Sequence, residues 1–220
     1  MRPKPRTAQP DANPVGGTIE LPARIPCGIR ACCCNGARSF HEWGSNMDAK
    51  RIARAGLMVA LLAASAQVML PFGPVPFTLQ TFVLAMIPAV LDRRTAVLTV
   101  VAYVLLGAVG LPVFSGFMGG FGALAGPTGG FLWGFILGMV AAGVLDRALP
   151  ARIPAYPRAL ASAAVLLLVS YVCGTVQLMA FLTIDLWGAL AIAVAPFIIP
   201  DAVKLVCGAR VGVSVARVLP

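Results

Sequence analysis

The sequence predicts an all-α integral membrane protein with six transmembrane helices, cytoplasmic N and C termini, and a glycine-rich outer loop that covers a ligand cavity. Composition is the first observation. Of the 220 residues, 59% are hydrophobic and 11% are charged, and the mean hydropathy is +0.89, which is too apolar for an ordinary soluble domain. The second observation is that the chain after Met47 divides into about six apolar runs near the ~20 residues that cross a bilayer. The expected spans are 52–70, 79–91, 95–110, 127–145, 159–182 and 200–218.

The positions of the charged residues are the third observation. The net charge of +9 alone would allow a nucleic-acid partner, but the cations lie at the ends of the expected helices. The loops 71–78, 111–126 and 183–199 contain no Lys or Arg. By the positive-inside rule we expect both termini in the cytoplasm, a multi-pass chain in the lipid bilayer, and no nucleic-acid partner. The cations that flank or end the alternate loops are Lys50, Arg51, Arg54, Arg93, Arg94, Arg147, Arg152, Arg158, Arg210 and Arg217.

Residues 1–46 differ in composition from the rest of the chain. They are rich in Pro and Arg, lack apolar periodicity, and have neither the apolar region nor the cleavage site of a signal peptide. We expect 1–46 to be a disordered leader or the product of a mis-assigned start codon, and 47–220 to form the six-helix substrate-binding domain. A cysteine cluster in the leader lacks the paired CxxC spacing of a zinc site, so no metal is expected. Its members are Cys27, Cys32, Cys33 and Cys34, with His41 nearby.

Residues 110–135 interrupt the apolar pattern with nine glycines and two prolines. Non-helical backbone at membrane depth is tolerated where protein covers it or where it lines a cavity. Glycine admits positive φ and leaves room for a ligand beside the main chain. We expect the first part of this stretch to fold back over a cavity, with Phe114, Phe117 and Phe121 as its apolar surfaces. A flexible outer loop without a ligand is the alternative.

Two further features lie inside the first spans. Gln80 is expected to face the bundle interior, because an unpaired glutamine in lipid is costly; there it either makes structural hydrogen bonds or contacts a ligand. In the first span, Gly56, Ala60 and Ala64 lie four residues apart on one helical face. Small residues at this spacing allow close approach of another helix, in this chain or in a partner.

The last span contains two ionisable residues, Asp201 and Lys204. Proline is favoured at the first helical position, so we expect Pro200 to begin the sixth helix and Pro127 the fourth. Asp201 then lies in the first turn, where the helix dipole favours a carboxylate, and Lys204 lies one turn deeper on the same face. Ionisable side chains in a span mark a function by default and are expected to pair. A purely structural ion pair is the alternative.

Catalytic motifs are absent from the expected membrane domain. The sequence contains no G-x-x-x-x-G-K-[ST] loop and no G-x-S-x-G, and its one histidine, His41, precedes the first span. An intramembrane enzyme would depend on Asp185 and Asp201, so we expect no enzymatic activity and no cofactor in this chain. The main rival function is a self-sufficient small-solute channel or facilitator in which the glycine-rich loop forms a constriction.

Three motifs together resemble the BioY family, the biotin-binding S-component of energy-coupling factor (ECF) transporters. They are VPFTLQT (75–81), LLGAVGLPVFSGFMGGFGALAGPTGG (105–130) and the ending formed by Pro196, Phe197, Asp201 and Lys204. The resemblance covers residues from about 47 to 220. The chain departs from the family's usual Pro-Gly-Asp before the last helix, because it has Ile199, Pro200 and Asp201 there.

The resemblance implies a protein of a prokaryotic cell membrane that captures biotin from outside. It also implies a transmembrane coupling subunit, bound through Gly56, Ala60 and Ala64, and cytoplasmic ATPases that alone use ATP. Asp201 would accept hydrogen bonds from the ureido ring, and Lys204 would either neutralise the tail carboxylate or hold Asp201 ionised. The implied substrate-binding residues are Asp201, Lys204, Phe114, Gly116, Gly119, Gly120, Gln80 and Tyr103.

Overall fold

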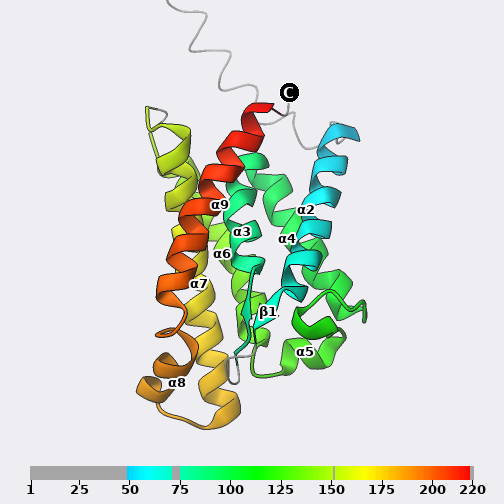
Figure 1. Ribbon diagram of the computed structural model, residues 1–220, viewed down its shortest axis with the longest axis vertical. Coiled ribbons are helices and arrows are strands. Elements are labelled where there is room, and N and C mark those ends of the chain that lie inside the picture. Colours follow the sequence, from blue (N-terminus) through cyan, green and yellow to red (C-terminus); the bar gives the residue numbers. More distant parts are fainter. Residues whose placement is uncertain (1–48, 71–74, 151, 219–220) are drawn as a thin grey trace, which may run out of the picture. The chain divides into compact units, whose positions relative to one another are not determined.

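The computed structural model describes residues 49–70, 75–150 and 152–218, and these are mostly helical (Figure 1). The leader predicted over 1–46 lies outside the described residues. Two short strands, β1 (Met69–Leu70) and β2 (Phe77–Thr78), pair antiparallel with Met69 opposite Thr78. The helices are α2 (Ala49–Gln67), α3 (Gln80–Val90), α4 (Arg93–Ala108), α5 (Phe121–Ala125), α6 (Gly129–Ala148), α7 (Ala155–Leu182), α8 (Leu186–Ala193) and α9 (Ile198–Val218), with a short 3-10 turn, η1 (Ser115–Phe117).

A helix overlaps each of the six predicted ranges. Within the described part of the chain, α6 and α7 are long and apolar enough to cross a membrane, and α8 with α9 would make a third span if this pair, bent by 50°, is counted as one. Two predicted helix starts are wrong. α6 begins at Gly129 with Thr128 as its N-cap, after Pro127, and α9 begins at Ile198, so Pro200 is its third residue. Proline is tolerated there because the first-turn N–H groups have no intrahelical partner.

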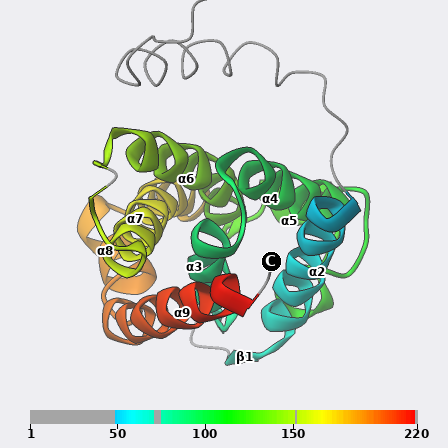
Figure 2. The same ribbon diagram turned by 90° about the horizontal axis from the view of Figure 1, so that it is seen from above.

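Helix α3 is the central element of the bundle. It packs against α2, α4, α6, α7 and α9, and the view from above shows it among these helices (Figure 2). Six of its eleven residues are buried, beginning with Gln80 at its first position. The first residue of the central helix is therefore placed to reach the interior.

Glycines allow the closest helix contacts. Gly130, Gly134 and Gly138 repeat every fourth residue on α6, and a Cβ added at Gly134 would lie only 2.6 Å from the Cα of Ser170 on α7. Gly208 similarly leaves room between α9 and the backbone of α3. Because packing in lipid must come from close backbone approach, these stripes hold α6 against α7 and α9 against α3.

The apolar core lies where α2, α3, α4 and α6 meet. Its buried residues include Leu62, Ile87, Val100 and Met139. A second, smaller cluster contains Val75, Leu178, Ala193 and Phe197. The second cluster joins α7 and α8 to the segment that precedes α3.

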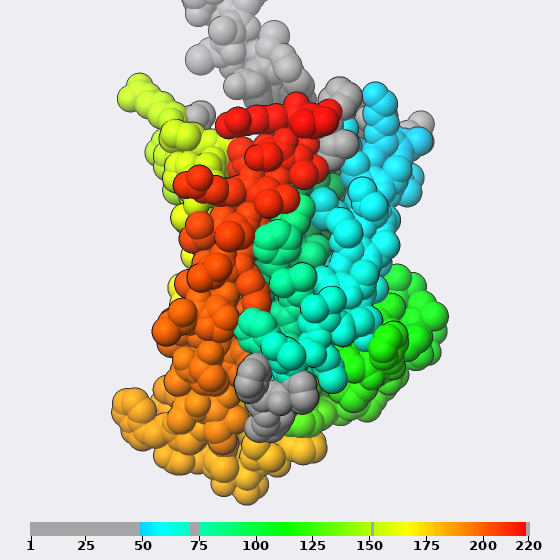
Figure 3. Space-filling view, in the orientation of Figure 1, coloured from blue at the N-terminus to red at the C-terminus, as the bar shows by residue number. Residues whose placement is uncertain are grey.

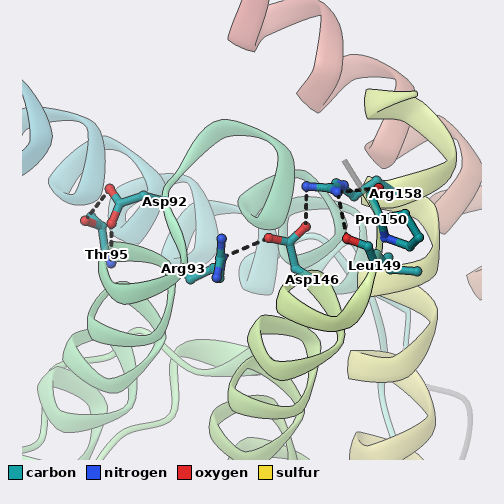
Figure 4. Close-up of polar contacts among 7 residues, drawn as sticks. All are labelled: Asp92, Arg93, Thr95, Asp146, Leu149, Pro150 and Arg158. Carbon is teal, nitrogen blue, oxygen red and sulfur yellow. Dashed lines mark hydrogen bonds and ion pairs between the residues drawn. The ribbon is translucent and has the colours of Figure 1, made fainter. Parts of the chain in front are cut away.

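Ion pairs join the ends of α4, α6 and α7 (Figure 4). Asp146 on α6 lies 2.9 Å from Nε of Arg93 and 3.6 Å from Nη1 of Arg158 on α7. Arg158 also donates to the carbonyl oxygens of Leu149 and Pro150, at 3.1 and 2.9 Å, in the turn between α6 and α7. The helix ends that carry these charges lie at the end of the bundle where α9 ends (Figure 1), as expected of cations gathered on one side of a membrane.

Candidate functional site

A cavity lies between the glycine-rich loop, the adjoining ends of α3, α6 and α9, and the middle of α7. The empty space among its lining residues is about 740 Å³, counting the part that opens to solvent. Its apolar lining includes Val75, Phe114, Met118, Phe131, Leu132, Phe135, Leu167 and Phe197. Its polar lining includes Thr78, Gln80, Thr81, Ser170, Tyr171, Asp201 and Lys204. The wall thus combines apolar and polar side chains in comparable number.

The predicted pairing of Asp201 with Lys204 is confirmed, and both residues are buried. Nζ of Lys204 lies 2.8 Å from Oδ1 of Asp201, three residues earlier on α9. It also donates to the carbonyl oxygen of Thr78 at 2.6 Å and lies 3.5 Å from the centroid of the Phe77 ring. The charged ammonium is therefore compensated on several sides, as a buried charge requires.

Asp201 also joins three helices through its hydrogen bonds. The Thr81 hydroxyl on α3 donates to Oδ1 at 3.0 Å, and the Tyr171 hydroxyl on α7 donates to Oδ2 at 2.7 Å. A carboxylate accepts about four hydrogen bonds, so three protein donors leave capacity for a donor from a ligand. Sequence reasoning missed Thr81 and Tyr171 as site residues. The available signals were the place of Thr81 in the VPFTLQT motif and the polar hydroxyl of Tyr171 inside an apolar span.

Gln80 faces the interior as predicted, and it lines the cavity. Its Nε2 donates to the hydroxyl of Tyr103 at 3.0 Å. Tyr103 itself is fully buried and is not part of the cavity lining. Its hydroxyl donates to the carbonyl oxygen of Val113 at 2.9 Å, so Tyr103 stands behind Gln80, between the cavity wall and the loop.

Of the three loop phenylalanines, the structure brings only Phe114 to the cavity. Its ring is buried, lines the cavity and meets Tyr103 edge-on at 5.7 Å between centroids. The space it fills is open because Gly107 has no side chain. Phe117 and Phe121 are 71% and 72% exposed, so the expectation that they cover the cavity is wrong. The short elements η1 and α5 turn these two side chains outward.

Gly116, Gly119 and Gly120 do not line the cavity. Gly116 and Gly120 have φ of 72° and 88°, a left-handed conformation that favours glycine. A Cβ at Gly119 would collide with the backbone of Leu111. In this structure the three glycines shape the loop backbone.

Gln67, at the last position of α2, holds the start of the loop. Its Nε2 donates to the carbonyl oxygens of Pro112 and Phe114, at 3.2 and 3.1 Å. Its Oε1 accepts from the backbone N–H of Phe117 at 2.9 Å. One side chain thus satisfies three backbone groups of a segment without regular pairing, which is an effective way to fix a loop.

Gln177 on α7 holds the end of the same loop. Its Nε2 donates to the carbonyl oxygens of Leu124 and Gly126, at 3.0 and 2.6 Å. The loop is therefore fastened at its two ends to different helices, α2 and α7.

The small-residue face of α2 is open. Gly56, Ala60 and Ala64 are all exposed, and a Cβ added at Gly56 would meet nothing within 4 Å. Figure 3 shows α2 as an uncovered surface on this side of the described domain. The alternative that this face docks against another helix of this chain is thereby excluded for the described residues.

Comparison with known proteins places the chain among transporters. The family model described as BioY family matches residues 39–220, starting inside the predicted leader. The chain is 38% identical over 168 residues to the biotin transporter BioY of Thermotoga maritima, covering 76% of this chain and 96% of the relative. It is also 38% identical over 158 residues to the probable biotin transporter BioY of Pyrococcus horikoshii, covering 72% and 91%.

One solved structure has the same fold. The crystal structure of the S-component for biotin from an ECF-type ABC transporter matches with a TM-score of 0.72 and 22% identity, covering 79% of this chain and 94% of the other.

Proposed function

The chain belongs to the BioY family, and we propose that it binds biotin in the cavity and serves as the substrate-specific subunit of an ECF transporter that takes up this vitamin. The family match and the names of the full-length relatives support this proposal. The chemical support for it is the buried carboxylate of Asp201 at the cavity wall, which can accept a hydrogen bond from the ligand.

Biotin presents a ureido ring with two N–H donors and a carbonyl, an apolar thioether ring and a carboxylated tail. Asp201 has spare capacity for one donor after its bonds from Lys204, Thr81 and Tyr171. A ureido N–H would give it a charge-assisted hydrogen bond, which is stronger than a neutral one. Lys204 uses two of its three N–H groups on Asp201 and the carbonyl oxygen of Thr78. This supports the role of holding Asp201 ionised over a role at the tail carboxylate.

The apolar part of the cavity suits the thioether ring. Phe114, Phe131, Phe135 and Phe197 contribute aromatic surface, and Met118 contributes a polarisable side chain. Enclosure by such groups, with a few polar anchors, is the usual composition of a small-ligand site.

We propose six membrane spans with both termini in the cytoplasm of a prokaryotic cell. The ion-paired helix ends around Asp146 and the end of α9 then face the cytoplasm (Figure 4), and the cavity opens toward the outside. The absence of Lys and Arg from 71–78, 111–126 and 183–199 supports this orientation.

The exposed face of Gly56, Ala60 and Ala64 on α2 is the proposed contact with the transmembrane coupling subunit. Cytoplasmic ATPases bound to that subunit would supply the energy, so this chain needs no cofactor of its own.

The experiment that tests the proposal is calorimetric titration of the purified protein with biotin. Asp201→Asn is expected to weaken binding by about 1.5–3 kcal/mol, because it removes a charged hydrogen-bond acceptor while keeping the shape of the side chain. Asp185→Asn is the matched control, because Asp185 precedes α8 and does not line the cavity. Unchanged affinity in a folded Asp201→Asn variant would contradict the proposal.

The rival functions are separated by transport and product analysis. A channel would admit labelled biotin into liposomes without ATP or a coupling subunit, whereas an S-component requires both for vectorial uptake. An enzyme would release an altered molecule. Mass spectrometry of the compound freed from the protein by mild denaturation is expected to show unmodified biotin.

A further inference from the structure

We propose that Tyr103 is a positioning residue that orients the amide of Gln80, so that Gln80 presents its carbonyl oxygen to an N–H of the ligand. The inference rests on the proposed binding of biotin, and it changes the expected part of Tyr103 from ligand contact to support of another side chain.

The orientation of Gln80 follows from counting donors and acceptors. The Tyr103 hydroxyl lies 2.9 Å from the carbonyl oxygen of Val113, and a carbonyl only accepts, so the hydroxyl proton is committed there. The hydroxyl oxygen can then only accept from its other neighbour. Gln80 lies 3.0 Å away and must therefore turn its NH₂ group toward Tyr103. Its Oε1 is left as the group that Gln80 can offer to the cavity.

The burial of both residues makes this orientation costly to reverse. Tyr103 is fully buried and Gln80 is 5% exposed, so neither can exchange its partner freely with water. A flipped amide would set two acceptors against each other at Tyr103. An unpaired polar group in such surroundings costs more than a normal hydrogen bond contributes.

The consequence for recognition is a second acceptor in the cavity wall. Asp201 has room for one ligand donor, and the oriented Gln80 supplies another acceptor. Two acceptors match a ligand with two N–H groups on one ring, which is the chemistry of a cyclic urea. Tyr103 also donates a hydrogen bond to the carbonyl oxygen of Val113 in the loop. The orientation of the Gln80 amide therefore depends on the position of the loop.

The test is a double-mutant cycle on the purified full-length chain, with biotin affinity measured by calorimetry. Tyr103→Phe removes the hydroxyl and keeps the ring against Phe114. Affinity is expected to fall about threefold to tenfold, the worth of one hydrogen bond. In a Gln80→Met background no amide remains to be oriented, so Tyr103→Phe is expected to cost less than about twofold there. Tyr156→Phe is the control, because its ring lies beneath Arg210, away from the cavity.

The outcomes separate this inference from the function itself. Failure of the unmodified protein to bind biotin would count against the proposed function. If that protein binds biotin, an equal cost of Tyr103→Phe in both backgrounds, or no cost at all, would overturn the positioning role. Thermal unfolding is measured for each variant. Should Tyr103→Phe not fold, Gln80→Met gives the decision, because it removes the acceptor and is expected to weaken binding severalfold; unchanged affinity would overturn the inference.

Discussion

Nζ of Lys204 lies 2.8 Å from Oδ1 of Asp201, and the two side chains are 9% and 5% exposed. A buried ion pair of this kind is stable only while each charge keeps its partners, because removing one leaves the other in an apolar surrounding. The pair spans one turn of α9 and reaches α3 and α7 through Thr81 and Tyr171. It therefore contributes to the packing of the bundle and to the wall of the proposed ligand site at once.

Replacing one charge of this pair is expected to destabilise the fold more than replacing both. Lys204→Met should lower the free energy of unfolding by about 3–5 kcal/mol, since the Asp201 carboxylate is then buried without its cation. The double variant Asp201→Asn with Lys204→Met should recover much of that loss while binding biotin poorly. Denaturant unfolding in detergent measures both. A Lys204→Met variant as stable as the unmodified protein would contradict this, because it would show that the buried Asp201 carboxylate does not need Lys204.

Loosening the loop at α2 is expected to speed the release of biotin. Gln67→Ala removes three hydrogen bonds to the backbone of Pro112, Phe114 and Phe117. The dissociation rate should rise severalfold, to on the order of tenfold, because the bonds are partly exposed and each is worth about 1 kcal/mol at most. Stopped-flow exchange of labelled biotin measures this rate.

The control for the loop variant lies on the same helix. The Ser65 hydroxyl donates to the carbonyl oxygen of Leu62, within α2, so Ser65→Ala should leave the rate unchanged. Hydrogen exchange at residues 113–117 should increase in Gln67→Ala alone. Equal rates in the two variants would mean that this glutamine does not hold the loop closed over the ligand.

A bulky side chain on the open face of α2 is expected to block the coupling subunit. Ala60→Trp or Ala64→Trp should abolish co-purification with that subunit while sparing biotin affinity, because both positions are exposed and neither lines the cavity. Val172→Trp, at an exposed position of α7, is the control. Survival of co-purification in both α2 variants would place the docking face elsewhere.

Much of the fold could be predicted because each helix carries its own signals. Apolar runs of sufficient length marked the helix ranges to within a few residues, and prolines marked the neighbourhood of two helix starts. The errors at Pro127 and Pro200 arose because proline is tolerated before the first turn and at several positions within it. The direction of Phe117 and Phe121 could not be predicted, because it depends on the short elements η1 and α5 inside the loop.

By itself the sequence determined which residues share a helical face: Asp201 with Lys204, and Gly56 with Ala60 and Ala64. The period of the α-helix sets these relations locally. Only the tertiary structure decided that Thr81 and Tyr171, 120 and 30 residues away from Asp201, complete its carboxylate. A polar side chain in an apolar helix can satisfy its hydrogen bonds in many ways, and the packing of distant helices selects one of them.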